Sequence, residues 1–242
     1  MRVAVVSDIH GNIHALDAVL QALAGEDADE LWCLGDLVGY GPRPNECCAA
    51  VAGRASVCLV GNHDLLALGY EVLEGEFNPD AAEAGRWTRS ALAQEWRAFL
   101  EGLPSHAEVD GAQLFHGSPR DPVWDYVLSR EGMVEALELT SAPLVLVGHS
   151  HVPFAFSAEG ELAFGPALAG AEAELADLRW VLNPGSVGQP RDGDPRASYL
   201  VLDLGAGRAS FRRVAYDVEL TQREIREEGL PETLAARLAT GV

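Results

Sequence analysis

The chain has 242 residues, 48% of them hydrophobic, which is enough to bury a sizeable core in one large domain or two small ones. Its 17 basic and 37 acidic residues give a formal net charge of −20, which argues against long nucleic acids and anionic membranes as partners. No apolar run is long enough to cross a bilayer, and the first predicted strand follows Met1-Arg2 directly, so we expect a cytoplasmic protein.

The chain opens with a short apolar strand that ends in a polar cluster. Val3 to Val6 are apolar and mostly β-branched, which predicts a fully buried strand. The segment Ser7-Asp8-Ile9-His10-Gly11-Asn12 follows, and Asn12 is a suitable N-cap for a helix that stops at Gly25. Because open α/β sheets bind ligands at the carboxyl ends of their strands, Asp8 and His10 are the first candidate site residues.

Two further predicted strands end in the same way. The apolar segment 31–34 ends in Gly35-Asp36, and the segment 56–60 ends in Gly61-Asn62-His63-Asp64. Between them, a helix is predicted over about 45–52, with Pro44 in its first turn. This alternation of strands and helices favours parallel pairing through right-handed crossovers.

The stretch from 65 to 103 has a helical pattern rich in Ala, Glu and Trp. Asn78-Pro79-Asp80 predicts a break, followed by a second helix over about 81–100. We expect this stretch to be an insertion that caps the site.

The pattern then changes to that of strands. Asp110-Gly111 predicts a hairpin between strands at 107–109 and 113–116, the second of which ends in His116-Gly117. After a helix over 130–139, the apolar strand 143–147 ends in Gly148-His149-Ser150-His151. Later elements are predicted as strands at 154–157, 161–164, 180–182, 198–203 and 209–214, and as one or two helices over 219–239. With no repeat or linker, the chain 1–242 is predicted to form a single domain.

Carboxylate, amide and imidazole side chains gather at these predicted strand ends. The set comprises Asp8, His10, Asp36, Asn62, His63, His116, His149 and His151. Such ligands suit Mn²⁺, Fe²⁺ or Zn²⁺ better than Ca²⁺ or an iron–sulfur cluster, and their number favours two ions that share a carboxylate. The four cysteines lack paired CxxC spacing and are expected to be buried free thiols. Each histidine alone would ordinarily be a solvated or hydrogen-bonded side chain, but five of the seven fall at or directly after strand ends.

The blocks D-x-H-G-N, G-D, G-N-H-D, H-G and G-H-S-H, spread over residues 8 to 151, resemble the five signature blocks of the calcineurin-like metallophosphoesterase superfamily. The segment 183–191 resembles the small prokaryotic phosphodiesterase branch, and the segment 116–122 resembles dinucleoside polyphosphate hydrolases. The fold implied is α+β, a four-layer αββα sandwich of two mixed β-sheets flanked by helices.

The resemblance also implies a role for each strand-end residue. Asp8, His10 and His151 would hold the first divalent ion, Asn62, His116 and His149 would hold the second, and Asp36 would bridge both. Two such ions can share a hydroxide for in-line attack on phosphorus. His63 would face the substrate, stabilise its charge as an imidazolium and protonate the leaving oxygen.

The second block departs from that of the protein serine/threonine phosphatases. Those enzymes carry G-D-x-V-D-R-G, where the later Asp orients the catalytic His and the Arg binds phosphate. Here the block reads Gly35-Asp36-Leu37-Val38-Gly39-Tyr40-Gly41, so both helpers are missing. This departure argues against a protein phosphatase.

Other groups near the blocks are candidates for binding the substrate. They are Tyr40, Arg43, Arg120 and Arg191, with Arg196 as a further loop arginine. An arginine fork suits a second phosphate, although each of these can equally be an ordinary surface charge. Trp124 and Tyr126 either stack on a nucleobase or pack their loop.

The sequence therefore predicts a dinuclear metal-dependent phosphohydrolase for small phosphodiesters or phosphoanhydrides, with nucleotide or dinucleoside polyphosphate substrates favoured. A cyclic-nucleotide or general phosphodiesterase is the alternative within the same chemistry. A catalytically silent scaffold on the same fold is the alternative of another class.

Overall fold

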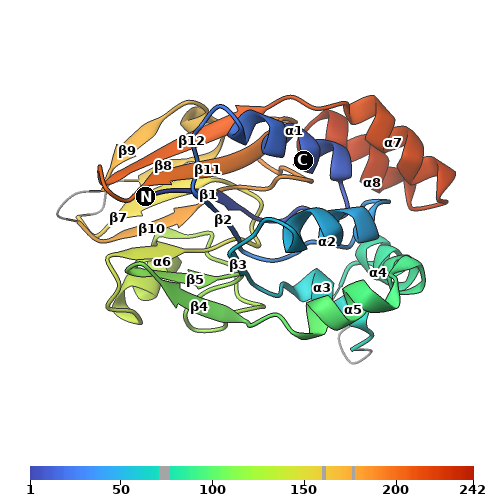
Figure 1. Cartoon of the computed structure of the whole chain (residues 1–242), viewed down its shortest axis with the longest axis horizontal. Helices are drawn as coiled ribbons and strands as arrows, with labels where there is room; N and C mark the ends of the chain where they lie inside the picture. The colour runs from blue at the N-terminus through green and yellow to red at the C-terminus, as the bar shows by residue number, and fades with distance from the viewer. Residues whose placement is uncertain (71–76, 160–161, 176–177) are drawn as a thin grey trace.

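Two six-stranded mixed sheets lie face to face in the computed structural model, with helices on their outer sides (Figure 1). The structure describes residues 1–70, 77–159, 162–175 and 178–242. This arrangement is the predicted αββα sandwich. Among the described residues, no helix is both long and apolar enough to cross a membrane.

The first sheet contains the opening strand at its centre, in the order β3-β2-β1-β11-β12-β9. Strand β1 pairs in parallel with β2, and β2 with β3, as the alternation of strands and helices predicted. Its strands are β1 (Arg2–Val6), β2 (Glu30–Cys33), β3 (Val57–Cys58), β9 (Glu172–Glu174), β11 (Ala197–Asp203) and β12 (Arg208–Val214).

The second sheet has the order β4-β5-β6-β10-β7-β8. It begins with the predicted hairpin, whose turn residues Asp110 and Gly111 both have positive φ, at 49° and 80°. Its strands are β4 (His106–Val109), β5 (Ala112–Phe115), β6 (Leu144–Leu146), β7 (Phe154–Ser157), β8 (Leu162–Phe164) and β10 (Trp180–Asn183). Residues 160–161 of the predicted loop and strand between β7 and β8 lie outside the described residues.

Three apolar layers join these elements. Val3 and Val5 of β1 face the second sheet, while Ala4 and Val6 face the helices α1 and α2, so both faces of the strand are buried. Met133 of α6 packs on the outer face of the second sheet. The helices are α1 (Ile13–Leu23), α2 (Pro44–Ala52), α3 (Asn62–Leu68), α4 (Pro79–Ala91), α5 (Gln94–Glu101), α6 (Arg130–Glu138), α7 (Val218–Glu227) and α8 (Glu232–Ala236), with short 3-10 turns η2 (Gly165–Leu168) and η3 (Arg237–Ala239).

The four cysteines are free, as expected. Cys33, Cys47 and Cys48 are buried and Cys58 is half-buried, and all four pack in the apolar layer between the first sheet and the helices α1 and α2. Burial raises the pKa of the Cys48 thiol, so the neutral thiol is favoured there.

Two strands differ from the prediction. The third strand covers only Val57–Cys58. The chain leaves the sheet after this strand, because the backbone N–H of Val60 donates to the carbonyl of Pro104 and not to a neighbouring strand. Strand β9 was missed since its sequence, Glu172-Ala173-Glu174, is acidic and mostly exposed and lacks the apolar alternation of a strand. It pairs with β12 at the edge of the first sheet, where charged residues are common.

The helix predicted over 81–100 is in fact two helices, so that prediction is wrong. Leu92 and Ala93 have extended backbones between α4 and α5. The Asn45 amide, from α2, donates to the carbonyl of Ala91 at 2.9 Å and accepts from the N–H of Ala93 at 2.7 Å. Asn45 therefore satisfies backbone groups on both sides of the break. Residues 71–76 of the predicted cap lie outside the described residues.

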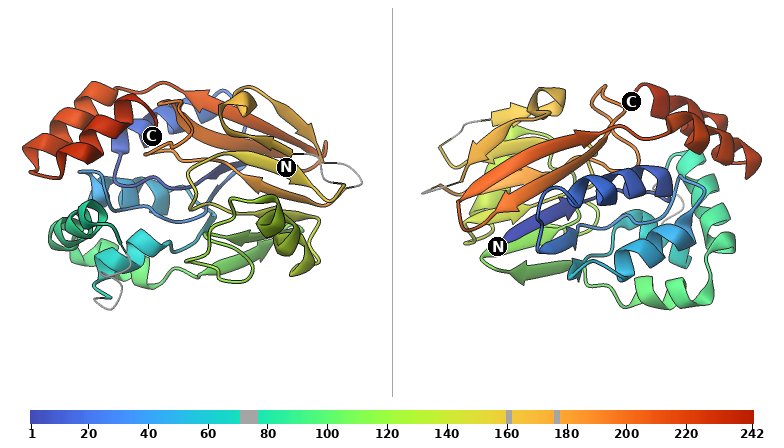
Figure 2. Two further views of the ribbon diagram at one scale, coloured as in Figure 1. Left: turned by 180° about the vertical axis from the view of Figure 1, so that it is seen from behind. Right: turned by 45° about the horizontal axis from the view of Figure 1, so that its top comes forward.

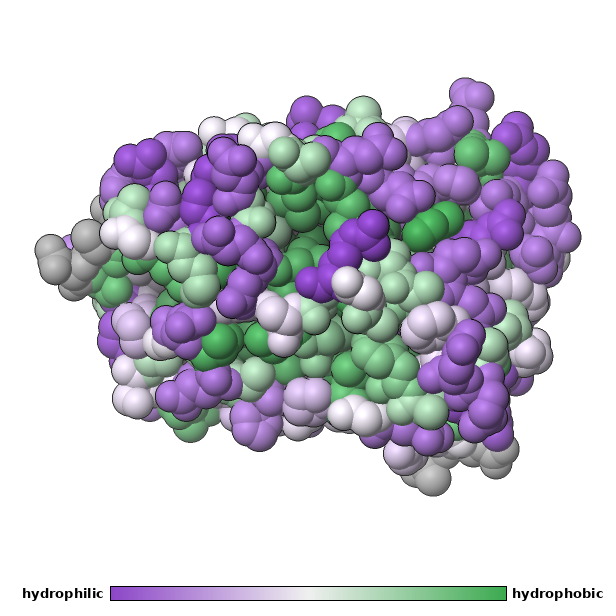
Figure 3. Space-filling view, viewed as in Figure 1, coloured by the Kyte–Doolittle hydropathy of each residue, from purple (hydrophilic) through white to green (hydrophobic). Residues whose placement is uncertain are grey.

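The C-terminal helices α7 and α8 lie beside α4 at one end of the sandwich (Figure 1), and the view from behind in Figure 2 shows the same placement. Their apolar residues, such as Ile225 and Leu234, pack with Ala84 of α4 around Tyr40. Hydrophilic residues cover their outward faces, whereas apolar residues gather nearer the middle of the face in Figure 3. These helices thus form a wall beside the strand ends.

Candidate functional site

The strand-end residues share an unusual backbone conformation. Left-handed φ values between 51° and 64° occur at Asp8, His10, Asp36, Tyr40, His149 and His151. Non-glycine residues adopt this region at an energetic cost, and such residues gather at functional sites. The sharp turns let several side chains from neighbouring strand ends point inward.

Close approach of the loops requires glycine at two positions. A Cβ on Gly61 would lie 2.1 Å from an oxygen of Asp36, and a Cβ on Gly41 would lie 2.2 Å from the carbonyl oxygen of His10. The glycines of the G-N-H-D and G-Y-G segments therefore make room for the carboxylate and for the D-x-H turn.

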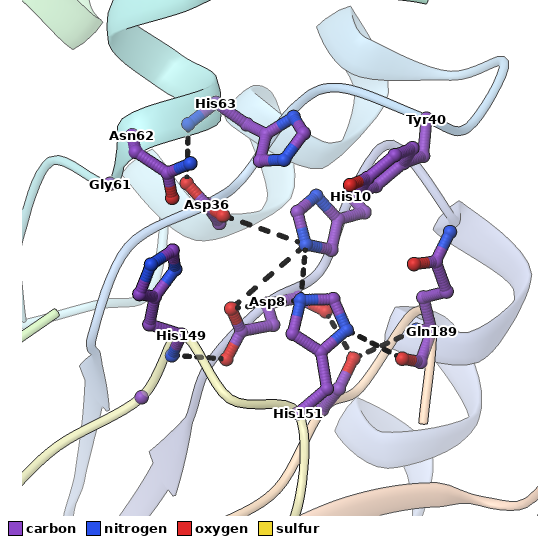
Figure 4. Close-up of polar contacts among 12 residues, drawn as sticks. Asp8, His10, Asp36, Tyr40, Gly61, Asn62, His63, His149, His151 and Gln189 are labelled. Atoms are coloured by element: carbon purple, nitrogen blue, oxygen red, sulfur yellow. Dashed lines mark hydrogen bonds and ion pairs between the residues drawn. The ribbon is translucent and has the colours of Figure 1, made fainter. Parts of the chain in front are cut away.

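The structure brings six of the seven predicted ligands into two adjoining groups. Asp8, His10, Asp36 and His151 form one group, and Asp36, His116 and His149 form the other, with the ligand atoms of each group within 4.8 Å of one another. Asp36 thus belongs to both. The side-chain oxygen of Asn62 lies 3.0 Å from Nε2 of His116, beside the second group. Figure 4 shows Asp8, His10, Asp36 and His151 pointing toward one another.

The histidine rings are held in one tautomer. In three of these histidines, Nδ1 donates a hydrogen bond to a backbone carbonyl at 2.6 to 3.1 Å. The pairs are His10 with Val38, His116 with Leu34, and His151 with Gln189. Because a carbonyl only accepts hydrogen bonds, each Nδ1 carries the proton and each neutral ring offers the lone pair of Nε2.

These lone pairs face other acceptors. Nε2 of His10 lies 3.0 Å from Nε2 of His151, and Nε2 of His116 lies 3.0 Å from the Asn62 oxygen. Two acceptors this close have no proton to share, so the contact favours a cation that both can bind.

The carboxylates fit a cation in the same way. Oδ1 of Asp8 and Oδ2 of Asp36 are buried, and no described residue forms a hydrogen bond with either oxygen. Oδ2 of Asp36 lies 3.5 Å from Nε2 of both His10 and His116. The donor set of carboxylate, amide and imidazole suits Mn²⁺, Fe²⁺ or Zn²⁺, so the residues present fit divalent ions.

Burial opposes the charged forms of these groups. Burial raises the pKa of Asp8 to about 7. Burial, together with the charge of the nearby His116, lowers the pKa of His149 to about 2. The pKa of Asp36 is likewise raised, by burial and by the neighbouring Asp64 carboxyl. Buried carboxyls without a counter-charge are unfavourable, and a bound cation would remove that cost.

His63 lies next to the two groups and lines a pocket. Its ring centroid is 4.3 Å from that of Tyr40 and 4.9 Å from that of Phe77. Its buried Nδ1 has no hydrogen-bond partner within the ranges that the structure describes. Burial and the charge of Arg191 hold the pKa of His63 well below its usual range. Aromatic packing, rather than a carboxylate, orients this ring.

The pocket in front of the strand ends has a volume of about 500 Å³. It is lined by Tyr40, Asn62, His63, Phe77, Asn78, Trp124, Tyr126, His149 and Arg191. Tyr126 stacks on His149 with ring centroids 3.7 Å apart, and Phe77 contacts Trp124 edge to face at 6.0 Å. Phe77 was missed from the sequence because only the fold brings it across from the helical insertion.

Among the predicted substrate-binding arginines, only Arg191 lines this pocket. Arg43 donates two hydrogen bonds to Glu224 of α7, at 2.8 and 3.0 Å, and Arg120 pairs with Asp125 at 2.6 Å. The structure therefore places Arg43 and Arg120 in ion pairs away from the pocket. Tyr40, by contrast, lies in the pocket wall, where its hydroxyl accepts from Arg191 at 3.3 Å.

Asp64 is a positioning residue that the sequence did not assign. Its buried carboxylate accepts from the backbone N–H groups of Asp36, Val38 and Gly61 at 2.9 to 3.1 Å. It thus joins the loop of Asp36 to the loop of Asn62. Its place as the Asp of the G-N-H-D block was the sequence feature that could have indicated this role.

The Asn-Pro-Gly-Ser segment 183–186 plays a similar supporting part. Asn183 donates to the Gly148 carbonyl at 2.8 Å, and the Ser186 hydroxyl donates to the Asp8 carbonyl at 2.7 Å. The segment therefore fixes the turns that carry Asp8 and His149.

Replacing Asp64 by alanine should lower the free energy of unfolding by about 3 to 5 kcal/mol, because three buried N–H groups lose their acceptor. Urea unfolding measures this, with the exposed Asp17→Ala as the control. A loss as small as that of the control would contradict the assigned role.

The sequence and structure match known proteins along the whole chain. Residues 1–207 match the calcineurin-like phosphoesterase superfamily domain. A crystal structure of a metallophosphoesterase from Sphaerobacter thermophilus superposes with a TM-score of 0.90 and 40% identity, covering 100% of this chain and 99% of that one. An uncharacterized protein of Methanocaldococcus jannaschii is 38% identical over 99% of this chain and 98% of its own length.

Two relatives carry names that state an activity. The phosphodiesterase YfcE of Escherichia coli is 26% identical over 84% of this chain and 88% of its own length. A symmetrical bis(5'-nucleosyl)-tetraphosphatase of Pseudomonas fluorescens is 35% identical over 43% of this chain and 40% of its own length. The predicted assignment to a family of phosphoester hydrolases is confirmed: the chain belongs to the calcineurin-like phosphoesterase superfamily.

Proposed function

We propose that the chain is a dinuclear metal-dependent phosphohydrolase for small phosphodiesters or phosphoanhydrides, with nucleotides and dinucleoside polyphosphates as favoured substrates. The observation that carries the proposal is the pair of adjoining ligand groups that share Asp36. A shared carboxylate between two groups of neutral imidazoles is what two neighbouring divalent ions require.

In this proposal the ligands divide as the family resemblance implies. Asp8, His10 and His151 hold one ion, Asn62, His116 and His149 hold the other, and Asp36 belongs to both shells. The ions, which we take to be Mn²⁺, Fe²⁺ or Zn²⁺, supply Lewis-acid activation of water and stabilisation of charge on the phosphoryl oxygens. The backbone N–H of His63 donates to Asp36 at 2.9 Å and so fixes the carboxylate between the two groups.

His63 is the proposed catalytic acid. Its ring lines the pocket beside Asn62 and Tyr40, so it can reach an ester oxygen of a substrate bound there. A negatively charged phosphoryl group next to the ring would raise the lowered pKa of His63 and favour its protonation. The ring then delivers that proton to the departing oxygen.

The aromatic lining supports a nucleotide substrate. Phe77, Trp124 and Tyr126 present ring surfaces in the same pocket that His63 and Arg191 line, and planar bases stack on such surfaces. The name of the Pseudomonas relative points to the same class. The net charge of −20 supports small substrates over long nucleic acids.

Trp124→Ala should raise KM for a nucleotide substrate by about 10- to 100-fold, because stacking on one aromatic ring contributes about 1 to 3 kcal/mol per base. Trp124→Phe should restore most of the affinity, and KM for bis(4-nitrophenyl) phosphate is the comparison. An unchanged nucleotide KM in Trp124→Ala would mean that the ring only packs its loop.

The alternatives have their own support. A general or cyclic-nucleotide phosphodiesterase is supported by the name of the Escherichia relative. A silent scaffold is disfavoured because it has no need for facing acceptors such as His10 and His151. The single domain, the cap formed by the 65–103 helices and the cytoplasmic location stay predictions; Phe77 and Asn78 of that stretch line the pocket.

Turnover after loading with Mn²⁺, Fe²⁺ or Zn²⁺ tests the proposal. The substrates are bis(4-nitrophenyl) phosphate, cyclic nucleotides and dinucleoside polyphosphates. We expect metal-dependent hydrolysis, with the highest kcat/KM for the dinucleoside polyphosphates. No hydrolysis with any of these ions would favour the scaffold.

A further inference from the structure

Arg191 is a pocket cation that has no acidic partner among the residues that the structure describes. Its guanidinium donates to the Gln189 side-chain oxygen at 2.8 Å and to the Tyr40 hydroxyl at 3.3 Å, both of them neutral acceptors. Its Nε is buried and has no hydrogen-bond partner in the described part of the chain. Within the described parts of the chain, no carboxylate forms an ion pair with it, although the protein carries 37 acidic residues.

Other arginines near the strand ends are neutralised by carboxylates. Arg43 pairs with Glu224, Arg120 with Asp125 and Arg196 with Asp194. Among the described residues, the guanidinium of Arg191 is thus the one of these four that can bind an external anion without first breaking an ion pair.

The loop that carries Arg191 is fixed in place before any ligand binds. The next residue, Asp192, forms a buried ion pair with Arg213 of β12. Arg213 also donates to the carbonyls of Asp194 and Arg196, at 3.2 and 2.9 Å. The N–H of Arg191 donates to the His151 carbonyl at 3.3 Å, which ties the cation to the metal-ligand turn. A preorganised cation binds an anion with less loss of entropy.

Tyr40 completes the cluster on the side of the ligand groups. Only 5% of the residue is exposed, its φ is 59°, and its ring lies 4.7 Å from that of His10 and 4.3 Å from that of His63. Its hydroxyl accepts from Arg191 and retains its own proton to donate. A cation and a hydroxyl donor therefore stand together beside the ligand groups.

The position of this pair is offset from the ligand oxygens. Arg191 makes no ion pair with Asp8 or Asp36, whereas His10 and His151 both contact Asp8 within 4.0 Å. Arg191 lines the same pocket as Asn62 and His149, so a molecule that spans this pocket can place one anionic group at the ligand groups and another at Arg191.

We propose that Arg191 and Tyr40 form a subsite for a second anionic group, adjacent to the phosphoryl group that is attacked, so that the protein prefers phosphoanhydrides with two or more charges to singly charged diesters. This inference rests on the proposed phosphohydrolase function and names its substrate class.

Kinetics with two substrates test the subsite. Arg191→Gln should lower kcat/KM for diadenosine tetraphosphate by about 10- to 100-fold, mainly through KM, because a hydrogen bond to a charged group contributes about that factor in affinity. The same variant should change kcat/KM for bis(4-nitrophenyl) phosphate by no more than about threefold. Tyr40→Phe should show the same selectivity with a smaller loss, and Arg191→Lys should recover part of it. Arg208→Gln, which removes a distant exposed charge paired with Glu174, controls for the change in net charge.

A binding measurement supplies a readout that does not need turnover. Calorimetry should show that methylenediphosphonate binds the metal-loaded wild type more tightly than Arg191→Gln by the same factor, whereas inorganic phosphate binds both alike. Equal losses for both substrates and both ligands would overturn the inference, since Arg191 would then bind the attacked phosphoryl group itself. If the wild type cleaves nothing, the proposed function fails, and the calorimetric comparison still decides the subsite.

Discussion

Asp36→Ala is expected to lower kcat/KM for every substrate by about 10³-fold or more and to remove bound metal at the same time. The carboxylate belongs to both ligand groups, so its loss opens both shells at once. Its other oxygen accepts from the N–H of His63, so the loop of Asn62 also loses an anchor.

The exposed Asp17→Ala is the control for Asp36→Ala, because it removes the same chemical group from the surface of α1. Steady-state kinetics and elemental analysis on the same samples measure the two effects. If Asp36→Ala keeps full activity, the shared carboxylate has no catalytic role and the two-ion account is wrong.

His63→Ala is expected to separate catalysis from metal binding. Loss of a general acid lowers turnover by about 10²- to 10⁴-fold. The metal content should stay that of the wild type, because the His63 ring belongs to neither ligand group. The expected pattern is a fall in kcat with little change in KM.

His106→Ala is the matched control, since this histidine is exposed and lies on β4, outside the pocket. 4-Nitrophenolate can depart without being protonated. The turnover of a 4-nitrophenyl ester should therefore fall less in His63→Ala than the turnover of a nucleotide. If the variant loses metal as well as turnover, His63 acts through the ligand shells rather than as an acid.

The sequence predicted most of the fold because the decisive signals are local. Apolar runs of a few residues, each followed by a polar block, marked the strands β1, β2, β5 and β6 together with their carboxyl ends. The inward orientation of those blocks depends on left-handed turns at residues such as Asp8 and His149, and Asp and His occur in this conformation more often than most other side chains.

The features that could not be predicted from the sequence depend on contacts between residues that are far apart in the chain. The break between α4 and α5 is held by Asn45 of α2, and no local pattern encodes that contact. The ion pair of Arg43 with Glu224 joins residues far apart in the chain. From the sequence, Arg43 and Arg191 were therefore equal candidates for binding the substrate. The tautomers of His10 and His151 likewise depend on carbonyls that only folding brings near.

Metal stoichiometry tests the central claim most directly. Elemental analysis of the wild type, after dialysis against Mn²⁺ and removal of free ions, should give about two ions per chain, as a dinuclear site requires. His63→Ala should also retain about two, and Asp36→Ala should retain fewer than one. A wild type that holds no stoichiometric divalent ion, or an Asp36→Ala variant that keeps both, would contradict the account.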